Sequence, residues 1–285
     1  AQADVSGPVQ LLHRRAWSAM LRVRSSNGDL FVKATAPGSV YEVALTEDLA
    51  RSWPELTVEL VAADPARGWM LMRDAGEPLR DRLARDPDLD IVRTLYRRYA
   101  ELQVAMAGRT ESLLAMGVPD RRTVRLPELL CDLPVDSSVV HDLIAAVTAC
   151  SLPDTLVHEE VHDGNVVVRD GAPVIIDWAD SSVGHPFFGV VVGLRSISDR
   201  LDLPPGAEQL EQVLSAYLDP WTGYAPADDL RAAFPAAYRL GMLNRALTWR
   251  ASLAGLDEAD RADHVAYVDA WLEEFTAAVD PLPGT

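Results

Sequence analysis

One segment of the sequence, residues 155–178, contains polar side chains whose types and spacing indicate chemistry. Glu160, Asn165 and Asp177 stand there among short apolar runs. A carboxamide oxygen and a carboxylate oxygen are ligands that Mg²⁺ prefers, and phosphate and water oxygens complete its octahedron. A further carboxylate beside such a metal is the acid or base that phosphoryl transfer to a hydroxyl requires. The segment predicts Asn165 and Asp177 as magnesium ligands and Glu160 as the catalytic group.

A tight hairpin is needed to bring these groups together. Asp170-Gly171 separates two β-branched runs, which predicts a two-residue turn with Arg169 opposite Ala172. The same register places Asn165 opposite Ile176, one residue before Asp177. The alternative is a sheltered hairpin in which the polar residues at its ends only cap turns.

The same segment offers a competing interpretation. Residues 158–162 read His-Glu-Glu-Val-His, which matches the H-E-x-x-H pattern of zinc hydrolases. That chemistry needs His158 and His162 on one face of a helix, with Glu159 as general base. A proline upstream and Asp-Gly-Asn downstream leave room for barely two helical turns. The zinc hydrolase is therefore the less favoured hypothesis, and both histidines are expected to organise the loop through hydrogen bonds.

The first 75 residues are expected to form a small sheet with one helix. Asn27-Gly28 lies between two strand-like runs and predicts a hairpin. Ser39 and Glu42 fit a capping box that begins a helix, and this helix would run to about Trp53, before a proline. Two further strands are expected at residues 56–62 and 69–72.

Beyond residue 75 the alanine and leucine spacing is typical of helices. Helices are expected at residues 91–107, 138–150, 207–218, 228–253 and 260–279. The strand and loop segment 155–178 interrupts them. The sequence thus predicts an α+β protein with a small β-rich lobe, residues 1–75, and a larger, mainly helical lobe, residues 76–285.

Composition limits the class of protein. The chain has 285 residues, of which 48% are hydrophobic and 24% charged, so it can bury a sizeable core. The net charge of −17 argues against a nucleic-acid partner and leaves room for a small cationic ligand, although solubility is the preferred explanation. The longest apolar stretch has about eight residues, far below the roughly 20 that cross a bilayer. No membrane partner and a cytoplasmic location are expected, and the two cysteines fit a reducing compartment.

The order His-x-acid-x-His-x-x-Asn, hairpin, Ile-Asp-Trp resembles the aminoglycoside phosphotransferase and choline kinase-like family of the protein-kinase-like fold. That family usually reads His-Gly-Asp-Leu-His-x-x-Asn and then Ile-Asp-Trp or Ile-Asp-Phe. The resemblance covers most of residues 15–195. It implies a bilobed fold with ATP and Mg²⁺ in the cleft between the lobes. It also implies a small-molecule acceptor with a hydroxyl, such as an antibiotic or a metabolite, and the residues equally permit a hydroxyl of a biosynthetic peptide.

The resemblance assigns roles outside the hairpin as well. Lys33 resembles the family lysine that pairs with the ATP phosphates, and Glu42 resembles its helix partner, with Glu47 in reserve. The alternatives are an edge-strand charge and a glutamate that only completes the capping box. Met72 and Asp74 fall where the family connects its lobes and offers backbone groups to adenine.

Two departures from the family pattern stand out. The turn expected over the phosphates, residues 15–20, contains no glycine, as in many members of this branch. Glu160 stands where the family has its catalytic aspartate. The extra methylene moves the carboxylate by roughly 1.5 Å, and a misplacement of about 1 Å can cost on the order of 10²-fold in rate. Either the loop compensates and the chain is an active phosphotransferase, or it is a pseudokinase that binds a nucleotide or another ligand.

Four further side chains have two interpretations. Asp180 is expected to cap a turn rather than face the acceptor. Trp249, Tyr267 and Trp271 lie where family members form the acceptor pocket, and core packing is the preferred interpretation of all three.

Overall fold

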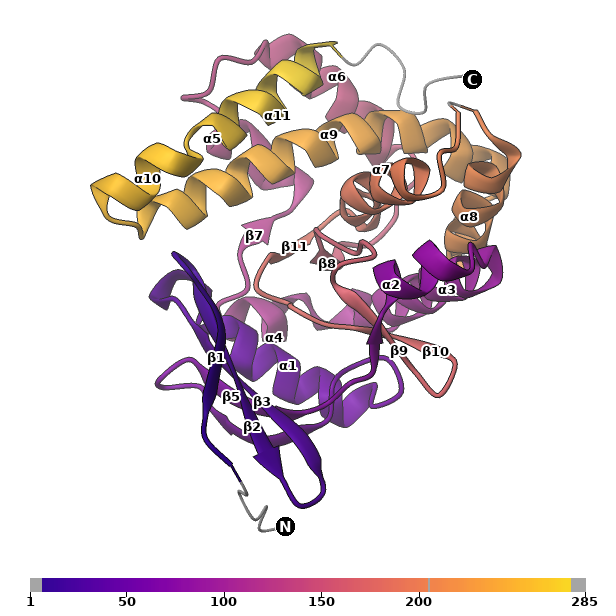
Figure 1. The fold of residues 1–285 in the computed structure, drawn as a ribbon. Helices are drawn as coiled ribbons and strands as arrows, with labels where there is room; N and C mark the ends of the chain where they lie inside the picture. The colour runs from indigo at the N-terminus through magenta and orange to yellow at the C-terminus, as the bar shows by residue number, and fades with distance from the viewer. Residues whose placement is uncertain (1–6, 205, 278–285) are drawn as a thin grey trace.

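Five antiparallel strands in the order β1-β2-β3-β5-β4 form the N-terminal sheet of the computed structural model, which describes residues 7–204 and 206–277 (Figure 1). They are β1 (Gln10–Arg15), β2 (Ser18–Ser25), β3 (Gly28–Thr35), β4 (Leu60–Asp64) and β5 (Trp69–Arg73). The predicted hairpin is present, with Ser25 paired to Gly28. Gly28 has a φ of +99°, a backbone conformation that glycine adopts without steric cost.

The helix of this lobe is α1 (Tyr41–Ser52), which follows a 3-10 turn at Pro37–Ser39 and ends before Pro54, as predicted. The predicted capping box is wrong, because Val40 is the N-cap and no side chain caps the helix. Glu42 is buried instead and pairs with Lys33. The strand predicted at 56–62 begins only at Leu60, because the residues before it turn toward the other lobe and bond to β10.

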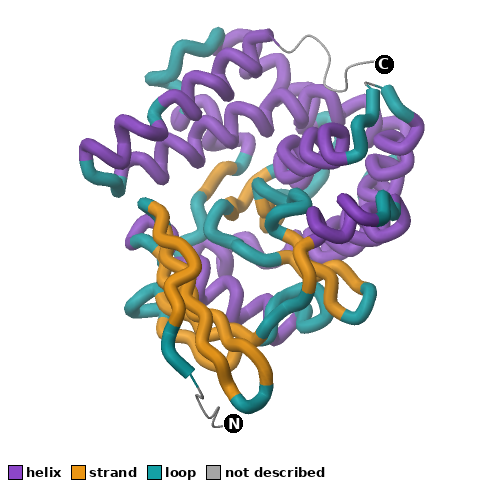
Figure 2. Tube along the Cα trace, in the orientation of Figure 1, coloured by secondary structure: helices purple, strands orange, loops and turns teal. Residues whose placement is uncertain are grey.

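Two three-stranded sheets lie between the N-terminal sheet and the helices (Figure 2). One has the order β10-β9-β6 and the other the order β7-β11-β8. The strands are β6 (Glu77–Pro78), β7 (Asp120–Arg121), β8 (Thr155–His158), β9 (Val166–Arg169), β10 (Ala172–Ile175) and β11 (Ser181–Gly184). The predicted register is confirmed, with Ala172 opposite Arg169. Asp170 and Gly171 have φ values of +52° and +79°, as a tight turn between twisted strands requires.

Ten helices are described in the larger lobe, within residues 76–204 and 206–277. They are α2 (Leu79–Arg85), α3 (Leu89–Met106), α4 (Thr110–Ala115), α5 (Leu126–Leu129), α6 (Ser137–Thr148), α7 (Val191–Arg200), α8 (Glu208–Leu218), α9 (Ala227–Ala254), α10 (Glu258–His264) and α11 (Ala266–Ala277). Further 3-10 turns lie at 107–109, 123–125, 186–190 and 219–223.

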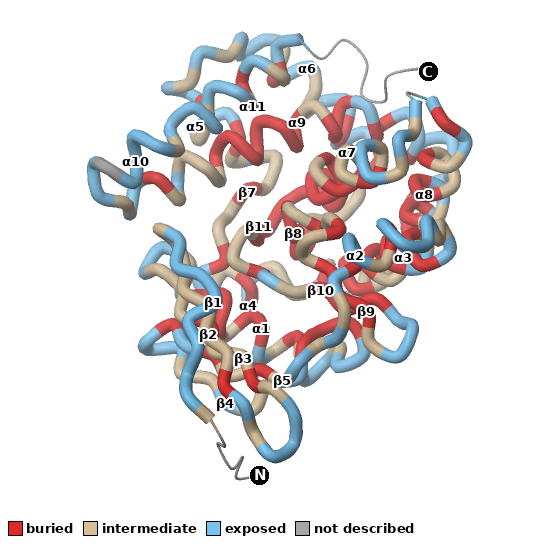
Figure 3. Tube along the Cα trace, in the orientation of Figure 1, coloured by how far each residue is buried: buried red, intermediate tan, exposed pale blue. Residues whose placement is uncertain are grey.

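The predicted helices are present with ends displaced by a few residues, except that the one expected at 260–279 is two helices, α10 and α11. The end of that prediction, residue 279, lies outside the described residues. Buried residues concentrate along α9, β8 and β11 (Figure 3), so the chemistry-bearing segment runs through the core of this lobe. None of the helices within the described ranges is long and apolar enough to span a membrane.

Residues 74–76 connect the five-stranded sheet to β6, which pairs with β9 of the larger lobe. Gly76 has a φ of +115°, and a Cβ placed on it would lie 2.1 Å from the backbone oxygen of Val168. Only glycine fits this connection without displacing β9. The division of the chain at residue 75 stays a prediction.

The lobes also meet through an aromatic cluster of Trp17, Trp249, His264 and Tyr267. Trp17, in the turn between β1 and β2, lies edge-on to Trp249 of α9 at 5.8 Å and to His264 of α10 at 5.1 Å between ring centroids. Trp249 stacks on Tyr267 of α11 at 4.4 Å. Tyr267 is 48% exposed, so the expectation of core packing is wrong for this residue.

Candidate active site

Lys33, in β3, pairs with two carboxylates from distant elements. Its Nζ lies 2.6 Å from Glu42 Oε1 in α1 and 2.7 Å from Asp177 Oδ1, two residues beyond β10. Burial by itself would lower the pKa of Lys33, but the two carboxylates raise it above its ordinary value. Lys33 is therefore a fixed cation. Glu47, the reserve candidate, lies elsewhere, 4.0 Å from Arg51.

Asp177 combines an exposed carboxylate with an unusual backbone. Its side chain is 45% exposed, and its φ of +62° lies in the left-handed region, which costs a non-glycine residue roughly 1–2 kcal/mol. Such conformations persist where the surrounding structure enforces them, and they cluster at functional sites. Here the surroundings include Tyr41 of α1, whose hydroxyl donates to the carbonyl oxygen of Ala179 and accepts from the amide of Ser181.

Asn165 lies beside both of the other predicted groups. The Ile176 amide donates to Asn165 O at 2.9 Å, so the hairpin register brings Asn165 next to Asp177. Asn165 Nδ2 donates to Glu160 O at 3.3 Å and lies 3.5 Å from Glu160 Oε2. With its nitrogen used in this way, Asn165 presents Oδ1 as an acceptor. A carboxamide oxygen beside a carboxylate is a donor set that fits Mg²⁺.

His158 ties the loop after β8 to the hairpin. Its Nδ1 accepts from the Glu160 amide at 3.1 Å, so its Nε2 carries the proton and donates to Ile176 O at 3.1 Å. Complete burial lowers the pKa of His158 to about 4, and the ring is neutral near pH 7. The expectation that this histidine organises the loop by hydrogen bonds is confirmed.

The geometry does not support the zinc pattern. His158 ends strand β8 and does not lie on a helix. Glu159 is buried, and its carboxylate accepts from Ser182 and Thr248 at 2.8 and 2.7 Å, so it is not placed as a base toward water. Within residues 7–204 and 206–277, no group of three or more histidine, cysteine, aspartate or glutamate side chains is arranged to hold a metal ion.

A buried arginine of α9, which sequence reasoning missed, completes the cluster. Arg245 is 1% exposed. Its Nη2 lies 2.6 Å from Glu160 Oε1, and its Nη1 lies 3.1 Å from Asp180 Oδ2. Asp180 is thus an ion-pair partner and not the predicted turn cap, and burial raises its pKa to about 6. A charged residue within the run 240–247, which is apolar except for Asn244, is the signal that could have identified Arg245.

Met72 and Asp74 lie at the connection between the lobes, where the resemblance places adenine. Met72 pairs within β5 to Phe31 and Leu60, and its side chain is buried in the N-terminal sheet's core. The amide of Asp74 donates to Asp29 O at 3.3 Å. That amide is already paired, and the adenine contacts of this segment stay a prediction.

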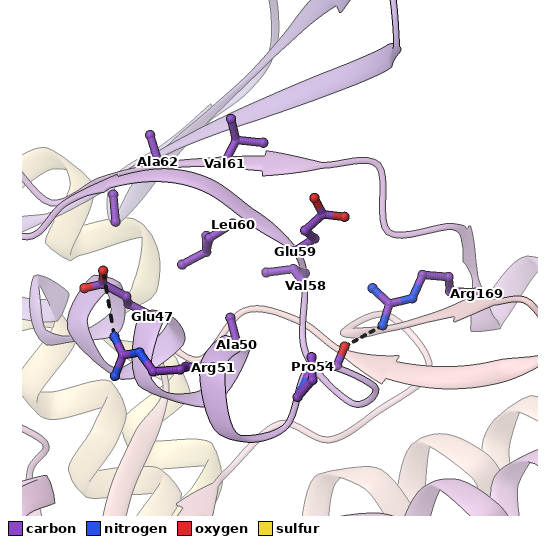
Figure 4. Close-up of a pocket in the computed structure, with 11 residues that line it drawn as sticks. Glu47, Ala50, Arg51, Pro54, Val58, Glu59, Leu60, Val61, Ala62 and Arg169 are labelled. Atoms are coloured by element: carbon purple, nitrogen blue, oxygen red, sulfur yellow. Dashed lines mark hydrogen bonds and ion pairs between the residues drawn. The ribbon is translucent and has the colours of Figure 1, made fainter. Parts of the chain in front are cut away.

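A cavity of about 650 Å³ lies on the N-terminal lobe between α1 and β4 (Figure 4). None of the predicted site residues lines it except the reserve residue Glu47. Its polar side chains are engaged: Arg169 donates to Pro54 O, and Glu59 pairs with Arg73. This cavity is separate from the cluster of Lys33, Glu160 and Asp177.

The chain belongs to the phosphotransferase enzyme family, whose model matches residues 36–230. No curated protein matches the sequence. Solved structures that resemble it include three phosphotransferases. Ethanolamine kinase of Plasmodium vivax is 14% identical, with 94% of this chain and 82% of that chain covered and a TM-score of 0.66. A macrolide 2'-phosphotransferase of Brachybacterium faecium is 18% identical, with 94% of each chain covered and a TM-score of 0.56.

The third is an amicoumacin kinase in complex with AMP-PNP, Ca²⁺ and Ami, which is 14% identical, with 99% of this chain and 92% of that chain covered and a TM-score of 0.59. Likenesses at this level of identity establish the fold. They confirm the predicted bilobed, protein-kinase-like architecture, in which a small β-rich lobe is followed by a larger helical lobe.

Proposed function

We propose that the chain is a Mg²⁺- and ATP-dependent phosphotransferase that acts on a hydroxyl group of a small molecule. The observation that carries this proposal is the convergence of Lys33, Asp177 and Asn165, from β3 and the two ends of one hairpin, beside Glu160. Asn165 Oδ1 and the Asp177 carboxylate would hold Mg²⁺, which when bound neutralises charge on the phosphates.

The reaction follows from the placement of the chain's own groups. Lys33, already ionised and buried, presents its ammonium to the α- and β-phosphates. Glu160 orients the acceptor hydroxyl and takes its proton as the oxygen bonds to the γ-phosphorus. The bond from that phosphorus to the β–γ bridging oxygen breaks, and ADP leaves with the electron pair. Positioning and charge neutralisation supply most of the rate.

The class of acceptor is inferred partly from the structures that resemble this chain and partly from its charge. The solved structures are named for ethanolamine, a macrolide and amicoumacin, which supports a small hydroxylated acceptor. The excess of acidic residues suits a cationic one. A hydroxyl of a biosynthetic peptide is a second acceptor of the same chemistry.

A nucleotide-binding pseudokinase is the second candidate function. The observation that favours it is the ion pair between Glu160 and Arg245, because a carboxylate oxygen engaged by a guanidinium is not free to take a proton from an acceptor hydroxyl. In this case the Lys33 and Asp177 groups would still bind Mg·ATP, but no phosphoryl group would be transferred.

Two measurements test the proposal. Thermal shift with ATP or GTP, each with and without Mg²⁺, measures binding to the native state, and we expect stabilisation by Mg·ATP. ATP consumption is then followed with aminoalcohol, aminoglycoside and macrolide acceptors for the wild-type chain, Glu160→Asp and Glu160→Ala. Turnover by wild type that is lost in Glu160→Ala supports the phosphotransferase. Turnover by Glu160→Asp alone supports the pseudokinase, and absence of any nucleotide shift contradicts both.

A further inference from the structure

Arg245 is surrounded by more negative charge than it can neutralise. Its guanidinium lies within 3.6 Å of Glu159, Glu160 and Asp180, and its side chain is 1% exposed. Removing charges from water is unfavourable unless paired groups and hydrogen bonds offset it. An arginine held there by several hydrogen-bonded acceptors therefore has a fixed position rather than a mobile one.

The anchoring of Arg245 does not depend on Glu160. Glu159, one of its partners, is itself held by Ser182 and Thr248. Asp180 is held through its backbone, because its carbonyl oxygen accepts from the Glu159 amide at 2.9 Å. The guanidinium is thus held from β11, α9 and the loop after β10 as well as by Glu160, whose side chain, like that of Asp180, is 27% exposed.

Both the backbone amide and the carboxylate of Glu160 are held by hydrogen bonds. Its amide donates to His158 Nδ1, its Oε1 accepts from Arg245 at 2.6 Å, and its Oε2 lies 3.5 Å from Asn165 Nδ2. An aspartate at this position would be shorter by one methylene, about 1.5 Å. With the backbone fixed by His158, that shorter carboxylate would not reach Arg245 at hydrogen-bond distance.

We propose that Arg245 is the positioning residue for Glu160, and that the two form a matched pair in which the arginine sets where the longer carboxylate lies. The inference rests on the proposed phosphotransferase function. If Arg245 positions the carboxylate, glutamate and not aspartate is the residue that supports activity at position 160 of this chain. Glu160→Asp therefore lowers activity here, although it restores the residue usual in the family.

The test uses Mg·ATP hydrolysis with water as the acceptor, so that no acceptor needs to be identified. We expect Arg245→Met to lower kcat by roughly 10²-fold with the KM for Mg·ATP within twofold. Arg245→Lys keeps the charge but not the fork geometry, and we expect a fall of about 10-fold in kcat. Arg121→Lys is the matched control, because Arg121 is also buried and bonds to α9 through Leu247 O; its kcat should equal that of wild type.

A double-variant cycle separates positioning from general loss of structure. In a Glu160→Ala background, Arg245→Lys should have no further effect on kcat, because the two residues act as one unit. Additive losses would overturn the inference, as would an unchanged kcat in Arg245→Lys or a Glu160→Asp variant as active as wild type. If Arg245→Met fails to fold, Arg245→Lys and this cycle decide the matter.

Crystal structures with Mg·AMP-PNP provide a readout that does not need turnover. In Arg245→Lys the Glu160 carboxylate should move away from its wild-type position, and an unmoved carboxylate would overturn the inference. A wild-type chain that binds Mg·ATP but does not hydrolyse it, with or without acceptors, would contradict the proposed function. The position of Glu160 in the Arg245→Lys crystals would then still show whether Arg245 places it.

Discussion

The Lys33 ammonium lies 2.7 Å from Asp177 Oδ1, although 144 positions separate the two residues in the sequence. The same ammonium lies 2.6 Å from Glu42. The cation predicted to meet the phosphates is therefore paired with a carboxylate predicted to bind the metal. Under the proposed function, Lys33 therefore contributes both to Mg·ATP affinity and to stability.

Replacing Lys33 should affect both properties. In Lys33→Met we expect Mg·ATP affinity to fall and the free energy of unfolding to drop by about 3 kcal/mol, because Glu42 is left buried without its partner. Isothermal titration and urea unfolding measure the two effects. Adding Glu42→Gln should recover part of the stability but none of the affinity. Wild-type affinity in Lys33→Met would remove this lysine from the site.

The role of Asp177 can be tested without disturbing its backbone. Asparagine tolerates the left-handed conformation, so Asp177→Asn should fold normally while the benefit of Mg²⁺ to nucleotide binding disappears. Asp170→Asn is the matched control, because Asp170 also has a positive φ but lies in the hairpin turn. Titration of ATP with and without Mg²⁺ distinguishes them. Equal Mg²⁺ dependence in the two variants would show that Asp177 does not bind the metal.

The buried His158 should make the protein sensitive to acid. Its pKa is about 4 in the folded chain and 6.5 as the ordinary value, so between these pH values the unfolded state binds the extra proton. The free energy of unfolding therefore falls as pH drops from about 6.5 to about 4, with His158 contributing on the order of 3 kcal/mol. The raised pKa of Asp180 acts in the opposite direction, so the difference between wild type and His158→Gln isolates the histidine.

Urea unfolding at several pH values between 4 and 7 measures this difference. The pH dependence should be weaker in His158→Gln, whereas His141→Gln, at an exposed position, should follow the wild-type curve. A His158→Gln curve parallel to that of wild type would contradict the assignment.

Substitutions at two glycines with positive φ allow the cost of backbone strain to be measured separately from the cost of steric overlap. Gly28 has open space around its missing Cβ, whereas a Cβ on Gly76 would meet Val168 O at 2.1 Å. We expect Gly28→Ala to cost roughly 1 kcal/mol and Gly76→Ala about 3 kcal/mol or more, since β9 must shift. Urea unfolding compares the two, and equal costs would show that the connection between the lobes accommodates a side chain.

Local patterns were sufficient to predict the hairpin. Asp170-Gly171 fixes a short turn, and the pairing that follows from it correctly placed Asn165 next to Ile176. Such pairs lie close in the sequence, and strand periodicity extends the register without further information. The predicted capping box was wrong because it used local spacing alone. That spacing assigned Glu42 to the helix end, whereas the ion pair with Lys33 in β3 determines the orientation of its side chain.

Long-range pairing was beyond these patterns. The placement of Lys33 and Asp177 at one site was expected only through the family resemblance, and their direct pairing was not expected, since neither residue's neighbours specify the other. Arg245 lies 85 positions from Glu160, and nothing in the spacing of α9 says which buried group an inward-facing arginine will meet. Its burial was readable from the apolar run around it, but its partners depend on how α9 packs against the loop after β8.

The contact between Trp17 and Trp249 joins the turn between β1 and β2 to α9. A rigid-body rotation of one lobe away from the other must break this edge-to-face contact. A motion in which both lobes turn as one body leaves it intact. The tryptophan pair is thus a built-in spectroscopic reporter of domain motion, and sequence changes near the carboxyl end, in α10 or α11, can alter the range of that motion without touching any catalytic group.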